Sequence, residues 1–106
     1  MAIRALSLRE FKQFNATRAR VARHTDQAVE WFANDNETVL GALAYHHLSL
    51  DWSLVVLRRN SDDTFRASDR AAGLSVLDDA RRLLLDKMEV ACAATDPVVA
   101  SRAAAA

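Results

Sequence analysis

The sequence predicts an α+β protein in which an antiparallel meander of three to four strands is flanked by an N-terminal and a C-terminal helix. Residues 51–59 form an unbroken, largely apolar run that is typical of a buried strand. A capped amphipathic segment lies on either side of the strand region. The strand candidates are joined by connections too short to hold crossover helices, which indicates antiparallel pairing.

The length and composition predict one domain. The chain has 106 residues, of which 51% are hydrophobic and 26% charged, so it can bury a core and disorder is not expected. We assign residues 1–96 to a single α+β domain and residues 97–106 to an alanine-rich C-terminal tail. Ala103 to Ala106 have the composition of a vector-derived extension and are left out of the fold prediction.

The N-terminal helix is predicted by its first turn. Ser7 and Glu10 have the spacing of a capping box, and Leu6 and Phe11 have that of a hydrophobic staple. Both signals place the helix start at the same residue. We therefore predict a helix from about residue 8 to about residue 24.

The C-terminal helix is predicted to begin at Ser75, which has the side chain of an N-cap. Asp78 and Asp79 follow in the first turn, where acidic side chains suit the positive end of the helix dipole. The helix should end near Thr95, because the residue before Pro97 is disfavoured in a helix.

The strands are predicted at residues 28–33, 38–45, 51–59 and 64–68. In the third of these, Trp52 and Leu54 point to one face and Val55 and Leu57 to the other, so both faces are apolar. We expect both helices to cover one face and a second copy of the chain to cover the other, with one helix on each face as the alternative that the sequence leaves open. The candidate interface residues are Trp31, Tyr45, Trp52, Leu54 and Val56.

The predicted order, α-β-β-β(-β)-α, is similar to that of the double-stranded-RNA-binding domain. That family begins its second helix with lysines that hold phosphates. Asp78 and Asp79 stand at that position in this chain and would repel phosphates. The resemblance is therefore one of topology and does not imply RNA binding.

A second resemblance rests on residues 41–67, about a quarter of the chain, which contain G-A-L-A-Y, D-W-S-L-V-V-L-R-R-N and F-R-A. This segment resembles one found in small uncharacterised bacterial proteins that have a D-W-x-x-V-V-L-x-R core followed by F-R-A. The resemblance implies a bacterial, cytosolic protein. It implies no activity, cofactor or site residue.

The net charge is zero at pH 7, but the charges are divided unevenly along the chain. Residues 1–24 hold six basic residues and one acidic residue, a charge of +5, whereas the remainder holds eight basic and thirteen acidic residues, a charge of −5. The basic helix either packs near the acidic remainder or binds an anionic partner. Its composition is also that of an organelle transit peptide, although the capping box indicates a folded helix.

Two groups of basic residues are candidates for binding anions. The N-terminal helix contributes Arg9, Lys12, Arg20 and Arg23. Arg58 and Arg66 form a smaller candidate patch on neighbouring strands, with ion pairs to Asp62, Asp63 or Asp69 as the alternative.

Few residues suggest chemistry. His46 and His47 are adjacent on a strand, where neighbours point to opposite faces, so they are not expected to share a metal ion. Cys92 is the single cysteine and lies in an apolar helix, so we expect a buried, unreactive thiol. The chain contains no phosphate-binding loop, nucleophile elbow or zinc motif. We therefore expect no enzyme activity, no cofactor and no metal.

The sequence thus predicts a non-enzymatic protein that binds another protein, as an adaptor, an immunity protein or a phage-type inhibitor does, and that forms a homodimer. The first alternative is a nucleic-acid-binding accessory protein that uses the basic helix. The second is a small-molecule binder or enzyme with a site near His46 and His47. The chain has neither 18 consecutive apolar residues nor a secretory signal, so we expect it to lack a membrane span and to be cytoplasmic.

Overall fold

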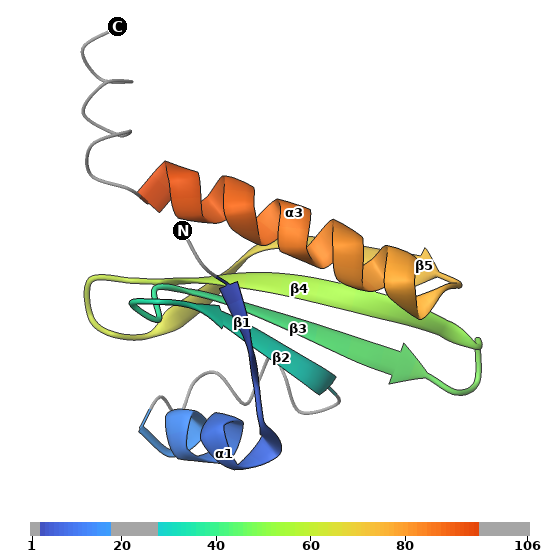
Figure 1. The fold of residues 1–106 in the computed structure, drawn as a ribbon, viewed down its shortest axis with the longest axis horizontal. Helices are drawn as coiled ribbons and strands as arrows, with labels where there is room; N and C mark the ends of the chain where they lie inside the picture. The colour runs from blue at the N-terminus through green and yellow to red at the C-terminus, as the bar shows by residue number, and fades with distance from the viewer. Residues whose placement is uncertain (1–2, 18–27, 96–106) are drawn as a thin grey trace, which may run out of the picture.

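The computed structural model describes residues 3–17 and 28–95, which form one sheet and two helices (Figure 1). The elements follow one another as β1 (Ile3–Leu6), α1 (Leu8–Thr17), β2 (Ala28–Asn34), β3 (Val39–His46), β4 (Asp51–Arg59), β5 (Phe65–Leu74) and α3 (Leu77–Thr95). The strands form an antiparallel meander in the order β1-β2-β3-β4-β5. The predicted α+β class and meander are confirmed.

The two faces of the sheet carry separate cores. On β4, Leu54 and Val56 belong to the cluster under α3, whereas Val55 and Leu57 belong to the opposite cluster together with Phe11 of α1. Figure 1 shows α3 above the sheet and α1 below it. The expectation that both helices cover one face is therefore wrong, although the predicted alternation along β4 is confirmed.

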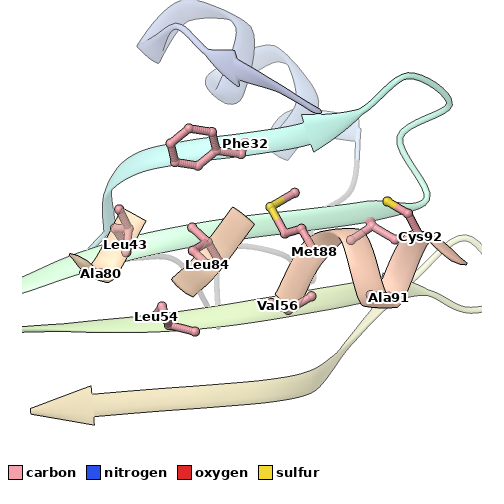
Figure 2. Packing of buried hydrophobic residues seen from close by; sticks show 10 residues of the cluster. Phe32, Leu43, Leu54, Val56, Ala80, Leu84, Met88, Ala91 and Cys92 are labelled. Carbon is pink, nitrogen blue, oxygen red and sulfur yellow. The ribbon is translucent and has the colours of Figure 1, made fainter. Parts of the chain in front are cut away.

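A glycine on β3 allows α3 to lie close to the sheet. A Cβ atom at Gly41 would lie 2.9 Å from Leu84 Cδ1 and would also clash with Met88 Sδ. Leu84 and Met88 are fully buried and project from α3 toward β3 and β4 (Figure 2). Small residues at such a position let a helix approach the backbone of a strand.

Two ion pairs fix the direction of α3 across the sheet. Arg81 holds the carboxylate of Glu30 on β2 with two hydrogen bonds of 3.0 and 2.8 Å, and Lys87 Nζ lies 2.8 Å from Asp69 Oδ2 on β5. The hydrogen-bonded ion pair with Glu30 raises the pKa of Arg81, and the one with Lys87 lowers the pKa of Asp69. Since β2 and β5 lie on opposite sides of β3 and β4, the helix is anchored at both flanks.

The predicted cap of α1 is confirmed. Glu10 N donates to Ser7 Oγ and Ser7 N donates to Glu10 Oε1, each at 3.1 Å, which is the reciprocal bonding of a capping box. Leu6 and Phe11 pack in the same cluster, as the staple predicts. Arg4 Nη1 donates to Glu10 Oε2 at 2.7 Å and so joins β1 to the cap. The predicted end of this helix, near residue 24, lies outside the described residues.

The cap makes stability depend on pH. The hydrogen bonds from Ser7, together with Arg4, lower the pKa of Glu10 below the ordinary value of a glutamate. A carboxylate with a lowered folded-state pKa stabilises the fold above its unfolded pKa and loses that contribution as the pH falls through the folded one. We expect Glu10→Gln to be less stable than the wild type at neutral pH, with the difference vanishing at low pH. Urea melts from neutral to acidic pH check this, and a difference that is independent of pH would contradict it.

The strand prediction missed β1 and shortened β5. Ile3–Leu6 lacks the alternation of a strand and is ordered by pairing with β2. β5 continues six residues past the predicted end at 68, with register shifts opposite Val56/Leu57 and Trp52/Leu54 and a left-handed Gly73 (φ 73°). These bulges keep an irregular, polar edge strand paired with β4.

The start of α3 differs by one residue from the prediction. Ala80 N donates to the carbonyl of Val76 at 3.0 Å, so Val76 rather than Ser75 is the N-cap. The helix ends at Thr95, as predicted. In residues 3–17 and 28–95, neither helix is long and apolar enough to cross a lipid bilayer.

Candidate functional site

The β3–β4 hairpin end, which we define as residues 45–52, exposes large apolar side chains. Its turn closes with a hydrogen bond of 2.7 Å from Leu50 N to the carbonyl of His46. Leu48 is 91% exposed and Leu50 is 68% exposed. Leu50 also has a left-handed backbone with φ of 57°, a conformation that is costly for residues with a Cβ and common only for glycine, asparagine and aspartate.

An aromatic pair forms the base of this hairpin end. Tyr45 and Trp52 are register partners, and their rings lie 4.9 Å apart at 55°. Trp52 packs against the cluster under α3, and Tyr45 remains 40% exposed. Val76 follows closely after Leu74, the partner of Trp52 on β5, and is also exposed. The pair therefore lies under an apolar surface that continues onto the start of α3.

A hollow lies beside the exposed leucines. It has a volume of about 670 Å³ and is lined by Tyr45, His46, His47, Leu48 and Ser49. This volume is in the range of ligand-binding pockets. The second-alternative site near His46 and His47 thus coincides with a real concavity of the surface.

The two histidines have different surroundings. His46 Nε2 lies 2.7 Å from Ser53 Oγ, whereas His47 is exposed in the turn. Within residues 3–17 and 28–95, no cluster of three histidine, cysteine or acidic side chains could hold a metal ion. The hydrogen bond gives His46 a role in joining β3 to β4.

Apart from Tyr45, the residues of the candidate interface are buried or half-buried. Leu54 and Val56 are 3% and 0% exposed because α3 covers them. Trp31 stacks on Phe11 with a ring separation of 4.4 Å, and its indole nitrogen is buried without a hydrogen-bond partner among the described residues. Of the predicted interface, Tyr45 and Trp52 therefore lie at the hairpin end and the other residues belong to the two cores.

The basic residues predicted to bind anions lie in different parts of the structure. Arg9 and Lys12 are exposed on α1, and Arg20 and Arg23 lie outside the described residues. Arg58 and Arg66 are directly opposite each other on β4 and β5, so the structure brings this predicted pair together.

Cys92 lies on the sheet-facing side of α3 and is 3% exposed. Burial raises the pKa of its thiol, and a hydrogen bond with Asn34 offsets part of this rise. A thiol with a raised pKa is a poor nucleophile at neutral pH because little thiolate forms. The predicted burial is confirmed.

Leu48 and Leu50 are the site residues that the sequence reasoning missed. They alternate with His47, Ser49 and Asp51 in a turn, where apolar side chains have no core to enter. Two leucines in a polar four-residue connection were the available signal. Their exposure could be recognised only once the strand ends on both sides were known.

Comparison with known proteins assigns no function. No protein-family model matches the chain, and neither the curated proteins nor the solved structures give a significant match.

Proposed function

We propose that this protein is a non-enzymatic protein–protein interaction protein that forms a homodimer through the β3–β4 hairpin end. One observation carries the proposal: Leu50 holds an apolar side chain 68% exposed on a left-handed backbone. Glycine or asparagine would adopt this backbone at a lower conformational cost than leucine. A leucine at this position costs conformational energy and solvation, which contact with a partner would offset.

The hairpin end is suited to pairing with itself. In a two-fold interface each copy presents the same patch, so a protrusion must meet a hollow of the same surface. Leu50 protrudes, and the hollow lined by residues 45–49 lies next to it. The insertion of Leu50 into that hollow on a second copy would occur twice in one dimer.

Charge does not oppose this pairing. The hollow is lined by aromatic, aliphatic, hydroxyl and imidazole side chains, without an acidic or lysine or arginine side chain. The chain as a whole has no net charge at pH 7. Two copies therefore approach without strong repulsion, and contacts with other proteins, as in an adaptor, would use the remaining surface.

The experiment is sedimentation velocity from micromolar to millimolar protein, with the double variant Leu48→Ser/Leu50→Asn beside the wild type. Asparagine tolerates the left-handed backbone, so the variant should fold at least as stably. We expect a wild-type dimer whose dissociation constant rises tenfold or more in the variant, at least about 1.4 kcal/mol of binding free energy.

Val90→Ser is the matched control, because Val90 is an apolar side chain 71% exposed on α3 and away from the hairpin end. It should leave the dimer unchanged. A wild type that stays monomeric at millimolar concentration contradicts self-association. A dimer that survives the double variant contradicts this surface.

The hollow also favours a second candidate function, the binding of a small molecule near Tyr45, His46 and His47. Soaking wild-type protein with a library of small aromatic fragments, read by nuclear magnetic resonance, tests it. Fragment shifts confined to these residues in the monomer would support the second candidate. The absence of any fragment contact there would remove it.

A further inference from the structure

A pair of arginines lies at the end of the sheet away from the β3–β4 hairpin. Arg58 on β4 and Arg66 on β5 are register partners, and Arg58 also pairs with Val39 at the start of β3. Cross-strand partners of like charge destabilise a sheet unless another group neutralises them. A stable pairing of β4 with β5 at this position therefore requires a group that neutralises the two arginines.

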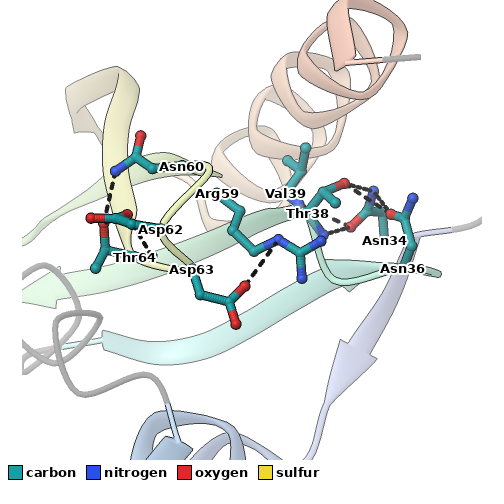
Figure 3. Close-up of polar contacts among 9 residues, drawn as sticks. All are labelled: Asn34, Asn36, Thr38, Val39, Arg59, Asn60, Asp62, Asp63 and Thr64. Atoms are coloured by element: carbon teal, nitrogen blue, oxygen red, sulfur yellow. Dashed lines mark hydrogen bonds and ion pairs between the residues drawn. The ribbon is translucent and has the colours of Figure 1, made fainter. Parts of the chain in front are cut away.

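The nearby carboxylates are engaged by other side chains. Asp69 is bound by Lys87 at 2.8 Å. Asp63 lies 3.6 Å from Arg59 Nε, and Asp62 accepts from the hydroxyl of Thr64 at 2.6 Å (Figure 3). In the described part of the chain, no acidic side chain forms an ion pair with Arg58 or Arg66. The alternative ion pairs considered from the sequence are thus not the ones formed.

The two arginines have different hydrogen-bonding surroundings. Arg66 Nη1 donates to Asn60 Oδ1, and Asn60 is itself oriented by its hydrogen bond of 2.9 Å to Thr64 Oγ1. Arg58 Nε is buried, and no group among residues 3–17 and 28–95 accepts a hydrogen bond from it. A buried donor without an acceptor is rare in folded proteins. An arginine side chain carries five N–H donors, and a single hydrogen bond, from Arg66 to Asn60, uses one of the ten in this pair within the described residues.

We propose that Arg58 and Arg66 form a binding site for one oxyanion, a phosphate or carboxylate group, gripped between the two guanidinium groups. The planar fork of arginine matches both groups with paired hydrogen bonds. An anion between the arginines would neutralise their repulsion, and a small rotation of Arg58 would give its Nε an acceptor. This site is remote from the hairpin end and does not depend on the proposed dimer.

The test follows the arginine Nε–Hε resonances by nuclear magnetic resonance while inorganic phosphate replaces chloride at constant ionic strength. We expect saturable shifts of Arg58 and Arg66, and no saturable shift of Arg82, an exposed arginine on α3. A parallel titration with acetate distinguishes a site for phosphate groups from a site that also binds carboxylates. Saturation by phosphate alone indicates a phosphate group, and saturation by both indicates that a carboxylate also fits.

Two variants test the assignment to this pair. Arg58→Gln and Arg66→Gln should each weaken phosphate binding tenfold or more, whereas Arg82→Gln should leave it unchanged. Thermal unfolding provides the second readout, because a ligand of the native state raises the melting temperature. Phosphate should raise it for the wild type and Arg82→Gln and not for the pair variants. Shifts that do not saturate, or equal binding by Arg58→Gln, would overturn the site.

Discussion

Leu84→Ala is expected to lower the free energy of unfolding by about 2–5 kcal/mol, the range for truncating a buried leucine. Leu84 is fully buried between α3 and the sheet, where Gly41 lets it approach the β3 backbone. Truncation leaves a cavity that neither the sheet nor the anchored helix closes easily. Because small domains have only about 5–15 kcal/mol of stability, this change removes a large part of it.

The measurement is urea unfolding followed by tryptophan fluorescence, with Val90→Ala as the exposed control on the same helix. Val90→Ala should change stability by less than about 0.5 kcal/mol. Equal stability of the two variants would contradict the placement of α3 on this face. Helix propensity does not explain the difference, because leucine and valine differ from alanine by less than about 0.7 kcal/mol and alanine is the better helix former in both changes.

A double-mutant cycle sharpens this test. Gly41→Ala alone should cost about 1–3 kcal/mol, because its Cβ would overlap Leu84 and Met88. In the Leu84→Ala background part of that cost should disappear, since one of the two clashing side chains is gone. Strictly additive effects would show that residues 41 and 84 are not in contact.

Asn34→Ala is expected to cost about 2–4 kcal/mol through lost hydrogen bonds. Asn34 is 1% exposed, and its Oδ1 accepts from Thr38 N and Val39 N at 2.9 and 3.0 Å. Its Nδ2 donates to Asn36 Oδ1 and Thr38 Oγ1 (Figure 3). Alanine would leave backbone donors at the start of β3 without acceptors, one of them buried.

The β4–β5 turn provides the matched control, because it has the same side-chain hydrogen bond and the same left-handed backbone position as the β2–β3 turn. Asn60 Nδ2 donates to Thr64 Oγ1 as Asn34 does to Thr38, and Asp63, like Glu37, has a left-handed backbone. Asn60 is more exposed, so Asn60→Ala should cost about 1 kcal/mol. Urea melts compare the two, and equal costs would show that burial does not decide the effect.

The structural features that depend on residues close together in the sequence were predicted correctly. Ser7 and Glu10 predicted a cap because their bonds span a single turn. The alternation along 51–59 predicted which side chains share a face, because the period of a strand is a local property. The short connections predicted the meander for the same reason.

The remaining features depend on residues that are distant in the sequence. Alternation does not say which helix covers which face of β4, and this depends on the close approach at Gly41 and on the ion pairs of Arg81 and Lys87 with β2 and β5. Leu54 and Leu50 are both apolar, yet one lies under α3 and the other is exposed on a turn. Composition and spacing therefore determined both helices, the strands β2 to β5 and their order, but not β1, which is ordered by its pairing with β2. Only the packing of α3 and α1 on opposite faces decided which apolar side chains remain for a partner, because burial is a property of long-range contacts.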